Sequence, residues 1–262
     1  METAKGRITG ESMKVAIVST PRTCSSFLGT IFADKFNLID YSEMFSEMWV
    51  KTDVHTKLKI ITRSDNYTAK ITSTSLTSYP GLFDYKTFPW DIFDYIILTE
   101  RLDVVQQAAS WLLLSHAHQI GNGDQETLVK YLTDGMTHPQ DFPDVNVNEL
   151  EHILHTINHF TDCIKPYLLN SGLKSVKLVN HEMFQKPKEE YIEELREKTE
   201  IYWRLDDIKR EDGKTSIDYT SYIEAKNLKN IIQETQNKLK GIYATKEETN
   251  QRTDTAEVEG TI

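Results

Sequence analysis

A short loop near the start of the chain carries residue types that bind anions. Residues 20–26, TPRTCSS, place Arg22 among hydroxyl side chains. The run VAIVS before this loop is typical of a strand buried on both faces of a parallel sheet. After it, apolar residues recur with helical spacing. Because the N–H groups of a helix's first turn attract an anion, Arg22 with the Ser25 and Ser26 hydroxyls predicts a phosphate or sulfate site.

Two other interpretations bear on how specific this loop is. Serine and threonine are favoured at any helix N-terminus, so the same residues are compatible with a plain helix cap. The glycine pair and the lysine of a Walker A loop are absent, which argues against ATP or GTP binding by that route. The pattern alone therefore leaves both the anion site and the plain cap open.

A second strand and helix later in the chain supply another arginine. Residues 95–99, YIILT, predict a strand, and Arg101 follows at its carboxyl end. The helical pattern DVVQQAASWLLLSHAH begins at Asp103 and contains Ser110, nine residues after Arg101.

The two segments together resemble the sulfotransferases that use phosphoadenosine phosphosulfate (PAPS). The string STPRTCSSFLG resembles their 5′-phosphosulfate loop, in the branch that reads roughly PRTGSS, and the Arg101–Ser110 pair resembles the residues that hold the 3′-phosphate. The resemblance implies PAPS as donor and adenosine 3′,5′-bisphosphate as product. The cofactor-binding residues that it implies are Arg22, Thr23, Cys24, Ser25, Ser26, Arg101 and Ser110.

The resemblance also implies three catalytic residues. Arg22 would contact the transferred group, and Lys70, in the predicted strand YTAKIT, would be its counter-ion. Glu43 lies about where this branch is proposed to carry the general base. From the residues alone, His55 and His116 are equally able to serve as that base, and Lys70 could instead point outward at a strand edge.

Cys24 departs from the resembled loop, which often has glycine there. A Cβ at that position disfavours a positive φ, so either the backbone is already helical or ligand binding is impaired. A thiol at a helix N-terminus can have a lowered pKa, which leaves a reactive-cysteine enzyme as another class of function. A nucleotide-binding protein or kinase-like phosphotransferase without sulfotransferase activity is the remaining alternative.

The resemblance and the strand pattern predict one fold class and one domain. We expect a three-layer α/β/α sandwich with a mainly parallel central sheet, the P-loop-like sulfotransferase fold, with strands at Val15, Thr68, Ile96 and Val176. The domain spans residues 13–244, between a flexible leader, 1–12, and a flexible polar tail, 245–262. The segment 73–85 is expected to be a loop, and the patterns at 147–169 and 222–239 each predict one helix.

Composition limits the partners. The 262 residues carry a net charge of −10, which argues against nucleic acid and against a highly sulfated polymer as acceptor. Aromatic residues in the variable stretches favour a small-molecule or saccharide acceptor. No apolar run is long enough for a membrane span and no secretory signal is apparent, so a cytoplasmic location is expected. Homo-oligomerisation is left open.

Three further groups of residues suggest binding or structural roles. His152, His155 and His159 share a helical face with Asp162, but the core pattern of that helix favours surface histidines, and no metal is predicted. Glu182 is predicted to be a structural cap after the last strand. The segment IKREDGK lies near where the resembled family places a cofactor-binding Arg-Lys-Gly loop, although that tripeptide is absent, so the resemblance offers Lys209, Arg210 and Lys214 as further residues for the 3′-phosphate.

Overall fold

The computed structural model describes most of the chain and divides it into two compact units. The described residues are 12–41, 54–77, 84–120, 130, 134, 138–173, 175–201 and 218–240. The first unit comprises those up to Gln107 and those from Thr156 to 201, and the second comprises Ala108–His155 and those from Asp218 onward. Glu43, Lys209, Arg210, Lys214 and nearly all of the predicted leader and tail lie outside the described residues.

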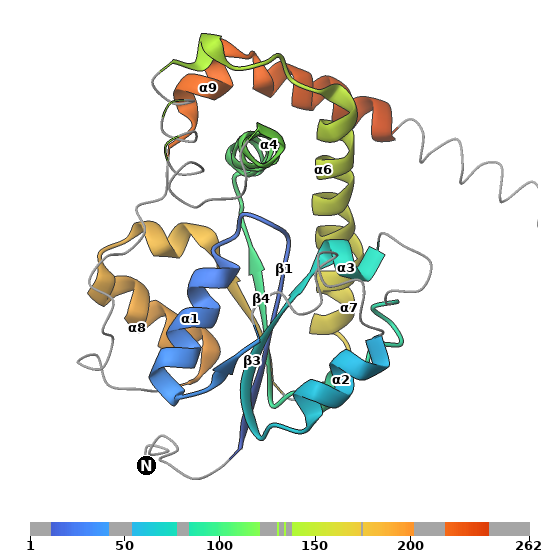
Figure 1. Cartoon of the computed structure of the whole chain (residues 1–262), viewed down its shortest axis with the longest axis vertical. Coiled ribbons are helices and arrows are strands. Elements are labelled where there is room, and N and C mark those ends of the chain that lie inside the picture. Colours follow the sequence, from blue (N-terminus) through green and yellow to red (C-terminus); the bar gives the residue numbers. More distant parts are fainter. Residues whose placement is uncertain are drawn as a thin grey trace, which may run out of the picture. The chain divides into compact units, whose positions relative to one another are not determined.

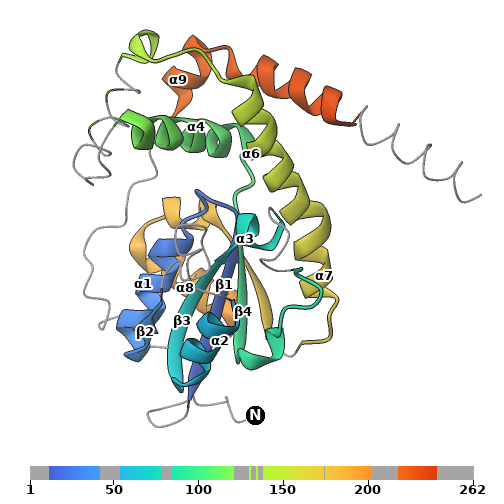
Figure 2. The ribbon, with the colours of Figure 1, turned by 45° about the vertical axis from the view of Figure 1, so that its right-hand side comes forward.

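A five-stranded parallel sheet forms the centre of the first unit (Figure 2). The strands are β1 (Met13–Ser19), β2 (Ile39–Asp40), β3 (Asn66–Thr72), β4 (Tyr95–Glu100) and β5 (Val176–Asn180). Their order is β2-β3-β1-β4-β5, and every neighbouring pair is parallel. The four strands that the apolar runs predict are confirmed, and the two-residue edge strand β2 was not anticipated.

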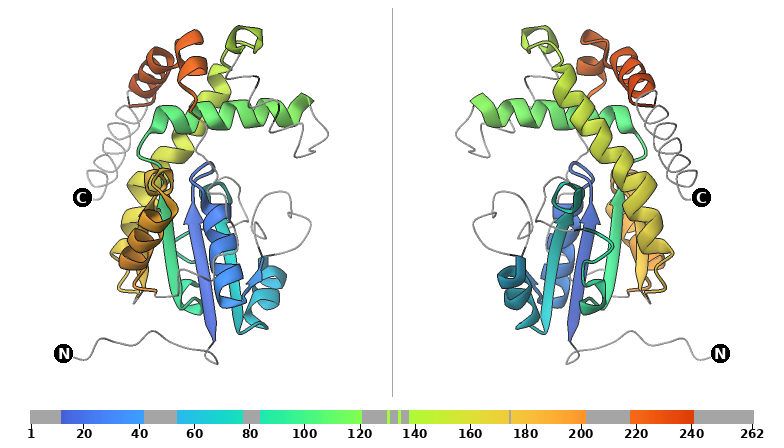
Figure 3. Two further views of the ribbon diagram at one scale, coloured as in Figure 1. Left: turned by 90° about the vertical axis from the view of Figure 1, so that its left-hand side faces the viewer. Right: turned by 90° about the vertical axis from the view of Figure 1, so that its right-hand side faces the viewer.

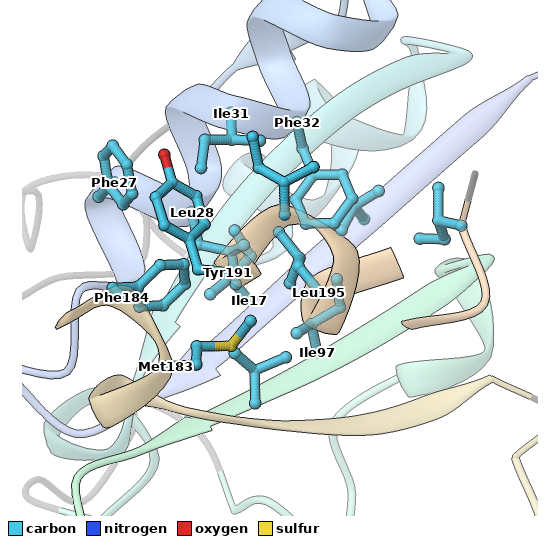
Figure 4. Packing of buried hydrophobic residues seen from close by; sticks show 14 of the residues in the cluster. Ile17, Phe27, Leu28, Ile31, Phe32, Ile97, Met183, Phe184, Tyr191 and Leu195 are labelled. Carbon is cyan, nitrogen blue, oxygen red and sulfur yellow. The ribbon is translucent and has the colours of Figure 1, made fainter. Parts of the chain in front are cut away.

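Helices α1 (Ser25–Phe36) and α8 (Lys188–Thr199) cover one face of the sheet (Figure 1). Val15 and Ile17 of β1 point toward this face, where Phe27, Phe184 and Tyr191 pack edge to face with ring centroids 5.5–6.2 Å apart (Figure 4). Such aromatic pairs stabilise a core beyond their buried area. This packing fixes α1, and with it the loop that precedes α1, against the carboxyl half of β1.

The opposite face of the sheet is covered by α2 (Val54–Thr62), α3 (Ser73–Thr77) and α7 (Lys165–Leu169). Ala16 and Val18 of β1 point this way, because successive side chains of a strand alternate between faces. With helices on both faces, the three-layer α/β fold with a parallel sheet is confirmed. The segment 73–85, expected to be a loop, instead begins with α3, whose Leu76 is buried in this cluster.

Two long helices connect the units. α4 (Val104–Ile120) starts in the first unit after β4, and α6 (Val147–His159) ends there. The helix predicted over 147–169 is present, but a π-helical stretch, Phe160–Ile164, separates α6 from α7. Three short 3-10 helices, Trp90–Ile92, Pro139–Asp141 and His181–Gln185, complete the described turns.

The second unit is helical in its described part. Besides α4 and α6 it contains α9 (Thr220–Ala225) and a helix at 228–240. The single helix predicted over 222–239 is wrong, because the chain breaks at Asn227, whose φ is 52°. Lys226 Nζ donates to the carbonyl of Phe142 at 2.5 Å, and the Ser110 hydroxyl donates to Tyr219 Oη at 3.0 Å. Among the described residues, no helix is both long and apolar enough to cross a membrane.

Candidate anion site

The loop at residues 20–24, here called the anion loop, lies where the strand order of the sheet reverses. From β1 the chain continues to β2 and β3 on one side, whereas β4 and β5 occupy the other side. Ser19 is in register with Thr99, so β1 and β4 end at the same level (Figure 3). In open parallel sheets, ligands bind at such a reversal, beside the carboxyl ends of the strands. Arg22 follows β1 and Arg101 follows β4 at this position.

The backbone of the anion loop is left-handed at two residues that are not glycine. Arg22 has φ 69°, and Cys24 has φ 60° and ψ 18°. The right-handed helical backbone considered for Cys24 is therefore wrong, and the chain keeps the conformation that glycine would favour. A non-glycine residue held in this region costs about 1–3 kcal/mol and persists only where its surroundings enforce it.

The N-terminus of α1 receives no side-chain cap from Cys24. Cys24 occupies the N-cap position but makes no side-chain hydrogen bond to the first turn, which contains neither aspartate nor glutamate. Ser25 is buried and Ser26 is exposed at the start of the helix. Since the first N–H groups of a helix have no partner inside it, this end of α1 retains the donors that an anion needs.

Thr23 anchors the anion loop to the sheet. Its side chain is fully buried, and Oγ1 donates to the carbonyl of Thr20 at 3.0 Å. The same Oγ1 is 2.8 Å from the Thr99 hydroxyl at the end of β4. The Thr23 hydroxyl is therefore engaged in supporting the loop. The predicted contact of Thr23 with a ligand stays a prediction, and it would be made by the backbone N–H.

Gln107 anchors the other end of the loop, and the sequence analysis missed it. This residue of α4 is 1% exposed, and its Nε2 donates to Thr20 Oγ1 and to the carbonyl of Pro21, each at 2.7 Å. The only sign of this role in the sequence is a glutamine directly before two buried alanines of α4.

Lys70 reaches the start of α1 from the neighbouring strand. It pairs in register with Ile17, which places its side chain on the face that α1 covers, and its Nζ donates to Ser26 Oγ at 3.1 Å. The residue is buried, so the outward orientation at a strand edge is wrong. A lysine charge beside the N-terminus of α1 adds to the attraction of that end for an anion.

Arg22 and Arg101 act electrostatically on one buried histidine. His181 follows β5 and is 4% exposed. Burial first, then the charges of Arg101 and of Arg22, together lower the pKa of His181 to about 4. Since both guanidinium charges affect the same imidazole, the structure brings the two arginines to one end of the sheet. Arg101 is itself buried, at 7% exposure.

We expect the lowered pKa of His181 to make folding stability depend on pH. Its folded pKa lies below the unfolded value, so the unfolded chain binds the proton first and stability falls as pH drops from about 6.5 to 4. The loss attributable to this group approaches about 3 kcal/mol. Urea unfolding at several pH values should show a shallower decline for His181→Gln than for wild type. The exposed His118→Gln is the control, and equal slopes for all three proteins would contradict the prediction.

Glu182 has the structural role predicted for it. Its Oε1 accepts the backbone N–H groups of Leu102 and Asp103 at 2.9 and 3.2 Å. Asp103 in turn caps α4 by accepting the Gln106 N–H at 2.9 Å. These bonds hold the segment that carries Arg101. On the other side of Arg101, Glu100 pairs with Lys165 Nζ at 2.6 Å.

The remaining predicted residues are placed as follows. Ser110 and His116 belong to the second unit, so the Arg101–Ser110 pair stays a prediction. His55 lies in α2. Among the described residues, no group of three histidine, cysteine or carboxylate side chains is arranged to hold a metal ion. His152 and His155 are exposed, and His159 packs edge to face against Tyr85 at 5.7 Å.

Comparisons with known proteins leave the family open. No family model matches the chain, and no curated protein matches it in sequence. Among solved structures, the chain is similar to the mouse sulfotransferase SULT7A1 complexed with PAP, with a TM-score of 0.38 and 12% sequence identity. That alignment covers 86% of this chain and 64% of the other. A likeness of this size assigns neither family nor activity, so the function is inferred from the residues of the anion site.

Proposed function

We propose that this protein is a sulfotransferase that moves a sulfuryl group from PAPS to a hydroxyl or amine. The observation that supports the proposal is that Cys24 gives α1 no side-chain cap at the reversal of the sheet, where Arg22 follows β1, Arg101 follows β4 and Lys70 bonds to Ser26. An overall charge of −10 makes this local gathering of cations unusual for the molecule. The choice of PAPS rests on the resemblance of the loop sequence and of the Arg101–Ser110 spacing.

The anion loop would hold the 5′ group of the nucleotide. Backbone N–H groups of the first turn of α1 and the hydroxyls of Ser25 and Ser26 are suited to the sulfuryl and 5′-phosphate oxygens. Lys70, already bonded to Ser26, would add a positive charge on the sheet side. Arg101, after β4, would bind the 3′-phosphate together with Ser110.

Sulfuryl transfer requires that the protein position the reactants and stabilise the charge that develops. The bond from sulfur to the bridging oxygen breaks while the acceptor oxygen or nitrogen bonds to sulfur, and the bridging oxygen keeps the electron pair. Arg22 would stabilise the charge that develops on that oxygen, as fixed cations do in phosphoryl transfer. A general base takes the acceptor proton, with Glu43 as the proposed residue and His55 and His116 as alternatives. The acceptor is proposed to be a small alcohol, amine or sugar.

A nucleotide-binding protein or kinase-like phosphotransferase is the second candidate. The same loop geometry would accept the 5′-phosphate of any nucleotide, because helix N–H groups do not distinguish phosphate from sulfate. The absence of the Walker A glycines and lysine disfavours it. A reactive-cysteine enzyme is less favoured, since nothing in the geometry around Cys24 requires its thiol.

A thermal-shift panel tests the proposal. We expect adenosine 3′,5′-bisphosphate to raise the melting temperature, while ATP, GTP and NADH leave it unchanged. At a hundredfold excess over Kd, a ligand stabilises the folded state by about 2.7 kcal/mol, which corresponds to several degrees. Transfer of labelled sulfate from PAPS to a mixture of alcohols, amines and sugars then separates an enzyme from a binding protein. Stabilisation by ATP alone would favour the phosphotransferase.

A further inference from the structure

The left-handed backbone at Arg22 needs something to hold it. An arginine gains nothing from a φ of 69°, and the loop contains no glycine that could absorb the turn. Such a conformation persists where neighbouring contacts over-determine it. The hydroxyl of Thr23, the residue after Arg22, fixes the far side of the turn through its contact with the Thr99 hydroxyl. What holds the peptide that directly precedes Arg22 is Gln107.

Gln107 holds the Pro21–Arg22 peptide by a hydrogen bond to the Pro21 carbonyl. Its Nε2 donates to the Pro21 carbonyl at 2.7 Å, and the Pro21–Arg22 peptide is planar and trans. In a trans peptide the carbonyl and the following N–H point in opposite directions. Holding the Pro21 oxygen toward α4 therefore turns the Arg22 N–H away from α4 and sets the axis about which the φ of Arg22 is defined.

Both N–H groups of the Gln107 amide are committed to the loop. One donates to Pro21 and the other to Thr20 Oγ1, also at 2.7 Å. Gln107 is 1% exposed and its bond to Thr20 Oγ1 is buried, whereas its bond to the Pro21 carbonyl is partly buried, so removing the amide leaves both acceptors without this donor where water has limited access. The side chain makes these contacts at the start of α4, in the stretch that the Glu182 carboxylate and Asp103 also hold.

We infer that Gln107 is a positioning residue of the anion loop, which keeps Arg22 in the left-handed conformation that directs it to the anion. Gln107 itself does not touch the ligand. The functional consequence rests on the proposed sulfotransferase activity, whereas the structural consequence, the conformation of Arg22, does not. The two are therefore measured separately.

Three substitutions separate the two hydrogen bonds. Gln107→Leu removes both. Gln107→Glu keeps a partner for the Thr20 hydroxyl, which can donate to a carboxylate, but places an acceptor against the Pro21 carbonyl. Thr20→Val removes only the Thr20 bond and keeps the size of the side chain. The neighbouring Gln106→Leu is the matched control on the same helix.

Crystal structures of these variants give the first readout. We expect the φ of Arg22 to leave the positive region in Gln107→Leu and Gln107→Glu, and to stay near its wild-type value in Thr20→Val and Gln106→Leu. An unchanged Arg22 backbone in both Gln107 variants would overturn the inference, whatever the protein binds.

The second readout is functional. With labelled PAPS, we expect the single-turnover rate of Gln107→Leu to fall about tenfold or more, because Arg22 is no longer held in the conformation that directs it to the anion. Affinity for adenosine 3′,5′-bisphosphate should fall by a smaller factor, because the α1 N–H groups still hold the 5′ group. A lower melting temperature with an unchanged rate per folded molecule would show a merely structural role and overturn the positioning role. If wild type does not bind the bisphosphate, the proposed function fails, and the crystal structures still decide the role of Gln107.

Discussion

Arg22→Ala should lower the single-turnover rate of sulfuryl transfer by about a hundred- to a thousandfold, the usual cost of removing one donor that stabilises charge in the transition state. In the proposed reaction, backbone N–H groups and hydroxyls would hold the 5′ group in both substrate and product, whereas Arg22 would follow charge onto the bridging oxygen. Only the second task is specific to the transition state. Affinity for the product nucleotide should therefore fall much less than the rate.

The backbone conformation of Arg22 allows the effect of Arg22→Ala to be assigned to the lost side chain. Alanine retains a Cβ, so the strain at φ 69° is the same in the variant and the melting temperature should change little. Arg22→Lys keeps a charge but loses the planar fork and should recover part of the rate. Ser25→Ala and Ser26→Ala should reduce affinity and rate by similar factors. If Arg22→Ala turns over at the wild-type single-turnover rate, Arg22 leaves the catalytic set.

Arg101→Ala should weaken binding of adenosine 3′,5′-bisphosphate by roughly ten- to a hundredfold, because a charge-assisted hydrogen bond contributes about 1.5–3 kcal/mol. Adenosine 5′-phosphosulfate, which has no 3′-phosphate, should bind the variant and the wild type almost equally. Calorimetric titration of both ligands measures the difference. Arg101→Met, similar in length but uncharged, controls for the space that alanine leaves at this buried position.

His181 provides a check that is independent of any ligand. The charge of Arg101 lowers the pKa of His181, so both Arg101 variants should raise it, and an NMR titration of the imidazole will detect the rise. Equal losses of affinity for the two nucleotides, with the His181 pKa raised, would show that Arg101 supports the fold of this region and does not recognise the 3′-phosphate.

The elements that the sequence predicts well are those whose pattern is local. The apolar run before the anion loop and the helical spacing after it predict β1 and α1. A strand buried on both faces is a continuous apolar run, whereas a helix buried along one stripe repeats its apolar residues every three to four positions. The same reasoning places β3, β4 and β5. It fails at α3, a single helical turn, and at β2, two residues long, because neither is long enough to show a period.

The orientation of Lys70 could not be predicted from the local sequence pattern. A lysine inside YTAKIT is compatible with either side of the strand until the register with Ile17 assigns it to the α1 face. Its bond to Ser26 joins residues 44 positions apart, and no spacing in the sequence relates them. Tertiary packing therefore decided that this lysine reaches the first turn of α1.

The amino-acid sequence by itself determined the class of fold and the position of the loop that we propose binds an anion, because strand burial, helix periodicity and hydroxyl-rich caps are properties of neighbouring residues. Only the tertiary structure decided the backbone at Cys24, which local preference would not make left-handed. It likewise decided that Gln107 holds the loop and that Arg22 and Arg101 share one buried histidine. These features depend on contacts between strands and helices distant in the chain. Such contacts can outweigh the local cost of a left-handed backbone, which is about 1–3 kcal/mol per residue.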